Sequence, residues 1–173
     1  MQGFYQLTAF ARRAFSSRVL NANSLINPAG INLLVAWTWI ALGFASGLAL
    51  GMKFHQPDWL GGYASLKRRL YRLAHISFFG LGAVNLMFYL TTKGLAASTS
   101  VTVASAAFVA GAVAMPLCCV LMAHRPALRL LFAVPVISLL VGAGLTISEI
   151  LFNQTAAGTW NLGLAFTTQF NQP

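Results

Sequence analysis

The sequence predicts an all-α integral membrane protein: a four-transmembrane-helix antiparallel bundle with an N-terminal amphipathic interfacial helix. Apolar residues make up 58% of the 173 positions and charged residues only 8%, whereas a soluble domain has about 25% charged residues. The mean hydropathy is +0.73. The apolar residues also form uninterrupted runs, each long enough to cross a hydrocarbon layer about 30 Å thick. These observations argue against a water-soluble core.

Residues 1–30 precede the first apolar run and are expected to lie in the membrane interface. Arg12, Arg13 and Arg18 fall off an apolar stripe with helical spacing, a pattern typical of a helix that lies flat on a membrane. The alternative is an arm that becomes ordered only against a partner. The stripe consists of Phe4, Leu7, Phe10, Ala11, Ala14 and Phe15.

Four apolar runs follow, at about residues 31–52, 74–92, 101–123 and 130–151, and none contains Lys, Arg or Asp. Because hydrocarbon offers the backbone no hydrogen-bond partner, each run must form a helix or a barrel strand. The alternating polarity of barrel strands is missing. Short connections favour antiparallel neighbours, so we expect one four-helix bundle over residues 31–152.

Residues 153–173 form an uncharged polar C-terminal tail rich in amides and hydroxyls. This composition is too polar to span a membrane and offers too little apolar surface to fold alone. We expect the tail to lie on a surface, either the membrane interface or a neighbouring subunit.

The basic residues predict the orientation. The first and third connections with their flanks carry seven of them, against four on the other side: Arg12, Arg13, Arg18 and Lys93. The positive-inside rule then places the first and third loops in the cytoplasm and both termini outside, in a multi-pass protein of the cell inner (plasma) membrane. The seven are Lys53, Lys67, Arg68, Arg69, Arg72, Arg125 and Arg129.

The formal net charge of +9 would suggest nucleic acid as the partner of a soluble protein. Here the basic residues flank apolar runs, where they meet phospholipid head groups. We therefore expect phospholipid and other membrane subunits as partners, with a homo-oligomer as a further option, and no nucleic acid.

Helix packing is indicated by Gly43, Gly47 and Gly51 in the first run. Glycine at every fourth position clears one face so that another backbone can approach closely. We expect this ridge to face a helix of the same chain, and the alternative is a helix of a partner. Asn85 lies mid-way along the second run. An unpaired amide there is costly, so Asn85 is expected to bond a neighbouring helix.

A cofactor site is suggested by histidines that the topology brings to one level. His55 follows the first run, His75 opens the second and His124 closes the third. Neutral imidazole is a common ligand of haem iron and of metals, so His75 and His124 are candidate ligands of a b-type haem. No Cys-x-x-Cys or His-x-x-x-His spacing exists, so no metal cluster is predicted.

His75 is the strongest candidate for contact with a haem or a quinone. Arg68, Arg69 and Arg72 precede it and could meet propionates or a quinone head group. Gly82 on the same helix face would leave room for a flat ring. The alternative is that these histidines are ordinary amphipathic residues at the interface.

The chain has two acids, Asp58 and Glu149, so convergent carboxylates for autonomous catalysis are missing. Two functions remain. The favoured one is a non-catalytic or redox-assisting membrane subunit of a larger complex, in respiratory or photosynthetic electron transfer. The alternative is a small stand-alone homo-oligomeric carrier or channel with a pathway past Asn85.

Overall fold

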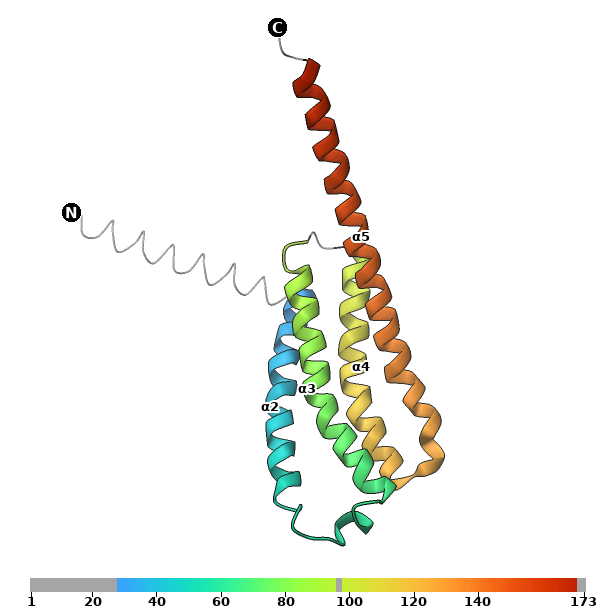
Figure 1. Cartoon of the computed structure of the whole chain (residues 1–173). Helices are drawn as coiled ribbons and strands as arrows, with labels where there is room; N and C mark the ends of the chain where they lie inside the picture. Colours follow the sequence, from blue (N-terminus) through green and yellow to red (C-terminus); the bar gives the residue numbers. More distant parts are fainter. Residues whose placement is uncertain (1–27, 96–97, 171–173) are drawn as a thin grey trace, which may run out of the picture.

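The computed structural model describes residues 28–95 and 98–170, and the side chains of residues 30–95 and 98–153. This part of the chain is all-helical and contains no strand (Figure 1). The elements, in chain order, are α2 (Pro28–Gly51), η1 (Trp59–Gly61), α3 (Leu66–Thr92), α4 (Thr99–His124), η2 (Pro126–Phe132) and α5 (Ala133–Phe170). The interfacial helix expected over residues 1–30 falls almost entirely outside the described residues.

Four helical segments are long and apolar enough to cross a membrane: Gly30–Gly51, Leu66–Thr92, Thr99–His124 and Pro126–Asn153. Each has at least 22 residues, and about 20 suffice for a hydrocarbon layer. The fold therefore fits a multi-pass membrane protein.

The helices pack in chain order. α2 packs on α3, α3 on α4 and α4 on α5, and α2 also contacts α4. In Figure 1 the connections that contain η1 and η2 lie at one end of the molecule, and the α3–α4 connection lies at the other. One third of the apolar window is buried in α3 and α4, against 11% in α2 and α5, so α3 and α4 form the inside of the structure.

Capping side chains decide where α3 and α4 begin. The Ser65 hydroxyl accepts a hydrogen bond from the Arg68 N–H at 3.2 Å, and the Ser98 hydroxyl accepts one from the Val101 N–H at 3.1 Å. Each serine satisfies a backbone donor that a helix start leaves unpaired. α3 therefore begins eight residues before the apolar run at 74, with its first two turns carrying the basic residues.

α5 is the element that differs most from its prediction. It starts at Ala133, after η2, and continues to Phe170 instead of ending near residue 151. The apolar span does end at Asn153, but a helix can continue through polar residues because its backbone bonds are internal. In Figure 1 this part of α5 projects beyond the other helices. The backbone is therefore helical over most of the C-terminal tail.

The proline inside α4 is compensated by a side chain of another helix. Pro116 has no N–H, so it leaves the Ala112 carbonyl without its usual helical donor; the Trp39 indole N–H of α2 donates to that oxygen at 3.0 Å. Pro135 lies in the first turn of α5, where a missing N–H costs no helical bond. Close by, the Leu131 carbonyl of η2 accepts from the Cys118 thiol of α4 at 3.3 Å.

Candidate functional site

Asn85 lies at the centre of a buried polar cluster that joins three helices. Its Oδ1 accepts a hydrogen bond from Asn32 Nδ2 of α2 at 2.8 Å, and its own Nδ2 donates to the Leu81 carbonyl at 2.8 Å. The Ser105 hydroxyl of α4 donates to Asn32 Oδ1. Both asparagines are 0% exposed. Because the amides bond one another, the cluster ties α2, α3 and α4 together.

The glycine ridge of α2 receives aromatic rings from α3. A Cβ at Gly43 would lie 2.8 Å from the Phe79 ring, and a Cβ at Gly47 would lie 2.8 Å from Cε1 of His75. A Cβ at Gly51 would meet nothing within 4 Å. Two of the three glycines therefore make room for side chains within the same chain.

His75 is held by this ridge and lines a cavity. Its Nδ1 lies 3.0 Å from the Ser46 hydroxyl, and its ring meets the Phe79 ring edge-on at 5.5 Å. The cavity, of about 310 Å³, lies between α2, α3 and η1, with one residue from α4. Its polar members are Ser46, Tyr71 and His75, with Trp59 beside them, and the other lining residues are apolar.

The Ser46 hydroxyl lies within hydrogen-bond distance of two groups. It is 3.1 Å from the Gly43 carbonyl, which can only accept, and 3.0 Å from Nδ1 of His75. In the arrangement that satisfies both groups, Ser46 donates to the carbonyl and Nδ1 donates to Ser46, which leaves Nε2 of the neutral ring as the acceptor. In that tautomer the His75 ring offers an acceptor for a ligand hydroxyl.

His124 is occupied by a different partner. Its Nε2 shares a hydrogen bond of 3.0 Å with the Tyr71 hydroxyl, and the two rings meet edge-on. His124 does not line the His75 cavity. Tyr71 links the two sites, because its side chain lines the cavity and bonds His124. The structure thus places the two histidines in separate environments.

Gly82 and Arg72 also lie outside the cavity. A Cβ at Gly82 would lie 3.2 Å from the Ala36 carbonyl oxygen and 3.2 Å from Cγ1 of Ile40. The space beside Gly82 is thus filled by α2. The α2 backbone approaches α3 closely at this glycine, as expected where a small residue clears a helix face. Arg72 instead stacks on Tyr63, with its Cζ 5.1 Å from the ring centre.

The sequence predicts Arg68 only as one of three arginines that could meet propionates or a quinone head group, and not as a buried residue. Its side chain is 0% exposed, although Arg is almost never fully buried unless paired. Gly61 and Gly62, with φ of 84° and 86°, turn the chain after η1 and bring Tyr63 over Arg68, with 3.9 Å between the ring centre and Cζ. The signal in the sequence is the aromatic run Phe54, Trp59 and Tyr63 just before the basic residues.

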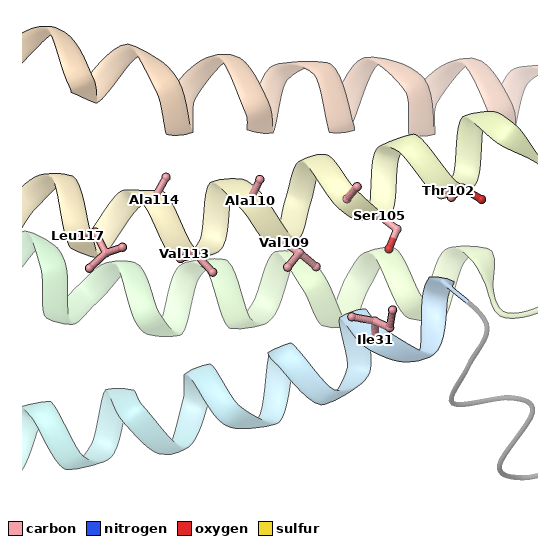
Figure 2. A pocket seen from close by; sticks show the side chains of 9 residues that line it. Ile31, Thr102, Ser105, Val109, Ala110, Val113, Ala114 and Leu117 are labelled. Carbon is pink, nitrogen blue, oxygen red and sulfur yellow. The ribbon is translucent and has the colours of Figure 1, made fainter.

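An apolar groove follows α4. It has a volume of about 700 Å³, and Figure 2 shows it lined by side chains along α4 with Ile31 of α2 across from them. Its hydroxyls are used internally, since Thr102 donates to the Ser98 carbonyl and Ser105 donates to Asn32. The groove is therefore an apolar surface, suited to a lipid chain or a neighbouring helix.

Among the described residues no group of three or more His, Cys, Asp or Glu side chains could hold a metal ion. Comparison with known proteins gives no match: no family model, no curated protein and no solved structure is similar to this chain. The geometry of the chain itself is therefore the basis of the functional argument.

Proposed function

We propose that this chain is a non-catalytic, redox-assisting membrane subunit of a larger membrane complex, and that the His75 cavity receives the head group of a quinone or quinol. The observation that carries the proposal is the cavity, where the imidazole of His75, the phenol of Tyr71 and the hydroxyl of Ser46 line a mostly apolar space. An apolar cavity of about 150 Å³ accepts a benzene ring, so about 310 Å³ accommodates a substituted six-membered ring.

The chemistry of the lining residues suits such a ring. The His75 Nε2 acceptor matches a quinol hydroxyl, and the Tyr71 phenol can donate to a quinone carbonyl or accept from a hydroxyl. Phe78 and Trp59 supply apolar ring surfaces. A b-type haem is less well supported, because His75 and His124 bond separate partners and do not face one cavity.

The rest of the proposal concerns the membrane. The four apolar helices cross the plasma membrane as an antiparallel bundle, with the η1 and η2 end in the cytoplasm, where the basic residues gather, and with both termini outside. We also propose, from the sequence pattern alone, that the segment of residues 1–30 lies along the interface. The groove on α4 and the extension of α5 beyond the apolar span are the surfaces offered to neighbouring subunits.

The alternative function, a stand-alone carrier or channel, needs a polar pathway past Asn85. The contacts of Asn85 argue against such a pathway, because Asn32 and the Leu81 carbonyl take up its amide and the cluster is buried between three helices. We therefore favour the subunit.

Quinone titration tests the cavity. A short-chain quinone added to the full chain in lipid nanodiscs is expected to quench tryptophan fluorescence in a saturable way, because Trp59 lines the cavity. His75→Phe keeps a ring but removes the acceptor, so binding should weaken about tenfold, the value of one hydrogen bond to a strong partner. His55→Phe changes an exposed histidine at the same end and serves as the control. Equal quenching of the wild type and His75→Phe would refute the proposed site.

A further inference from the structure

The start of α3 buries a positive charge beneath the α2–α3 connection. The Arg68 guanidinium is 0% exposed and is surrounded by aromatic rings, at 3.9 Å from Tyr63, 5.7 Å from Trp59 and 5.9 Å from Phe54. Its one hydrogen bond from the side chain runs from Nη1 to the Pro57 carbonyl, at 3.4 Å. Stacking on ring faces stabilises a cation, but it leaves the donors in the guanidinium plane unused.

A second guanidinium lies beside the first. Arg72 follows Arg68 by four residues, so both side chains lie on one face of α3. The Arg72 Cζ is 5.1 Å from the centre of the same Tyr63 ring. Tyr63 thus has two cations within 5.1 Å of its ring centre, and their mutual repulsion has to be offset.

The two arginines have the same unused edge. In each, Nε and Nη2 are buried and have no hydrogen-bond partner. These two nitrogens form the side of the guanidinium that binds two oxygens of a phosphate or carboxylate at once. Leaving four such donor atoms buried and unpaired is costly, so their shared geometry points to an oxyanion.

The chain has no acid in place for these edges. Its two acids are Asp58 and Glu149; Asp58 is exposed, and Glu149 lies in α5. Among the described residues no carboxylate reaches the free edges of Arg68 and Arg72. The described part of the chain therefore leaves these edges open to an external oxyanion.

We propose that Arg68 and Arg72 form an oxyanion site that binds a phosphate group, supplied by an anionic phospholipid of the adjoining membrane. The positive end of the α3 dipole lies at the same place and favours an anion. The phosphate enters beside Tyr63, whose side chain is 61% exposed, and the bound group fastens the connection to α3. This inference does not depend on the quinone proposal, because neither arginine lines the His75 cavity.

The test is native mass spectrometry of the full chain in detergent after incubation with phosphatidylglycerol or phosphatidylcholine. The wild type is expected to retain phosphatidylglycerol selectively. Arg72→Gln should bind it about tenfold more weakly, since one charge-assisted pair is lost. Arg69→Gln is the matched control, because it removes the same charge from an exposed neighbour on the same helix. Arg68→Gln should weaken phosphatidylglycerol binding as Arg72→Gln does, provided that the variant folds. Arg72→Gln alone is sufficient for the test.

A second arm separates the sources of phosphate. Inorganic phosphate is added to lipid-depleted protein, and the thermal midpoint is followed. Stabilisation of the wild type and of Arg69→Gln, but not of Arg72→Gln, without selectivity for phosphatidylglycerol would assign the same site to a soluble phosphate. Equal lipid retention by all variants together with no effect of phosphate would overturn the oxyanion site. Equal loss in Arg69→Gln and Arg72→Gln would also overturn it, because general attraction to the basic end would then explain the binding.

Discussion

Asn85 and Arg68 are both fully buried polar residues of α3, but their surroundings differ. The Asn85 amide is paired through both of its polar atoms, with Asn32 and the Leu81 carbonyl. The Arg68 guanidinium keeps two of its nitrogens unpaired. A closed network stabilises the fold, whereas open donors call for a ligand. This difference is why Asn85 is assigned to helix packing and Arg68 to binding.

Asn85→Ala is expected to destabilise the chain by about 1–3 kcal/mol, because the Asn32 amide is left buried without its acceptor. Reversible unfolding in mixed micelles measures the change. Thr91→Ala, on the same helix, is the control, since the exposed Thr91 hydroxyl bonds only its own helix at Met87. A loss no larger than that of Thr91→Ala would show that the cluster contributes little.

Gly47→Ala is expected to displace the His75 ring, because its Cβ would lie 2.8 Å from Cε1. Quinone binding should therefore fall while the fold is kept. Gly51→Ala introduces the same methyl group where nothing lies within 4 Å, and it should bind as the wild type does. If the two variants bound quinone alike, the contact between Gly47 and His75 would have no bearing on the cavity.

At the scale of elements, the apolar runs predict the membrane-spanning parts but not the full helices. The apolar runs begin at about residues 74 and 101, while the helices begin directly after the caps Ser65 and Ser98. Hydropathy measures only apolar character, so it does not predict where a capping hydroxyl starts a helix. Hydropathy also does not predict that α5 continues as a helix beyond Asn153, where the apolar span ends.

The candidate site could be predicted only in part. Position along the chain was enough to place His75 at the basic end, and a glycine ridge was enough to predict a close neighbour for α2. Two contacts depend on how each helix is rotated about its own axis: that of the His75 ring with Gly47, and that of Gly82 with α2. Periodicity does not fix that rotation when a helix is apolar on all sides. The buried Arg68 depends on a loop that no periodicity describes.

The bond from Trp39 to the carbonyl released by Pro116 gives a test at the same scale. Trp39→Phe should cost about 0.5–1.5 kcal/mol, because the Ala112 oxygen loses its donor. In a Pro116→Ala background residue 116 regains its N–H and can satisfy that oxygen within the helix. The cost of Trp39→Phe should then be smaller, as a double-mutant cycle in micelles would measure. An unchanged cost would mean that the indole contributes by packing alone.

At the scale of the whole molecule, the basic residues gather at the end that holds η1 and η2, and Lys93 lies at the opposite connection. Cysteine labelling tests the orientation that we propose. Lys93→Cys should react with a membrane-impermeant reagent on intact cells, and Lys53→Cys should react only after the membrane is opened. The native Cys118 and Cys119 are buried in α4 and give the background. The reverse pattern would invert the topology.

The subunit assignment rests on features of the whole molecule. The buried Asn32, Asn85 and Ser105 bond one another, the groove on α4 is apolar, and α5 extends beyond its apolar span. Such a chain has surfaces for neighbours and little chemistry of its own. It should therefore be found with partners that carry the redox centres.

Purification of the tagged chain from its native membrane in a mild detergent tests this claim most directly. The account predicts that the chain is recovered with larger redox proteins at a fixed ratio, measured by native mass spectrometry and by the visible spectrum of the complex. Recovery of the chain only as a monomer or a homo-oligomer, with no redox protein at fixed ratio, would contradict it.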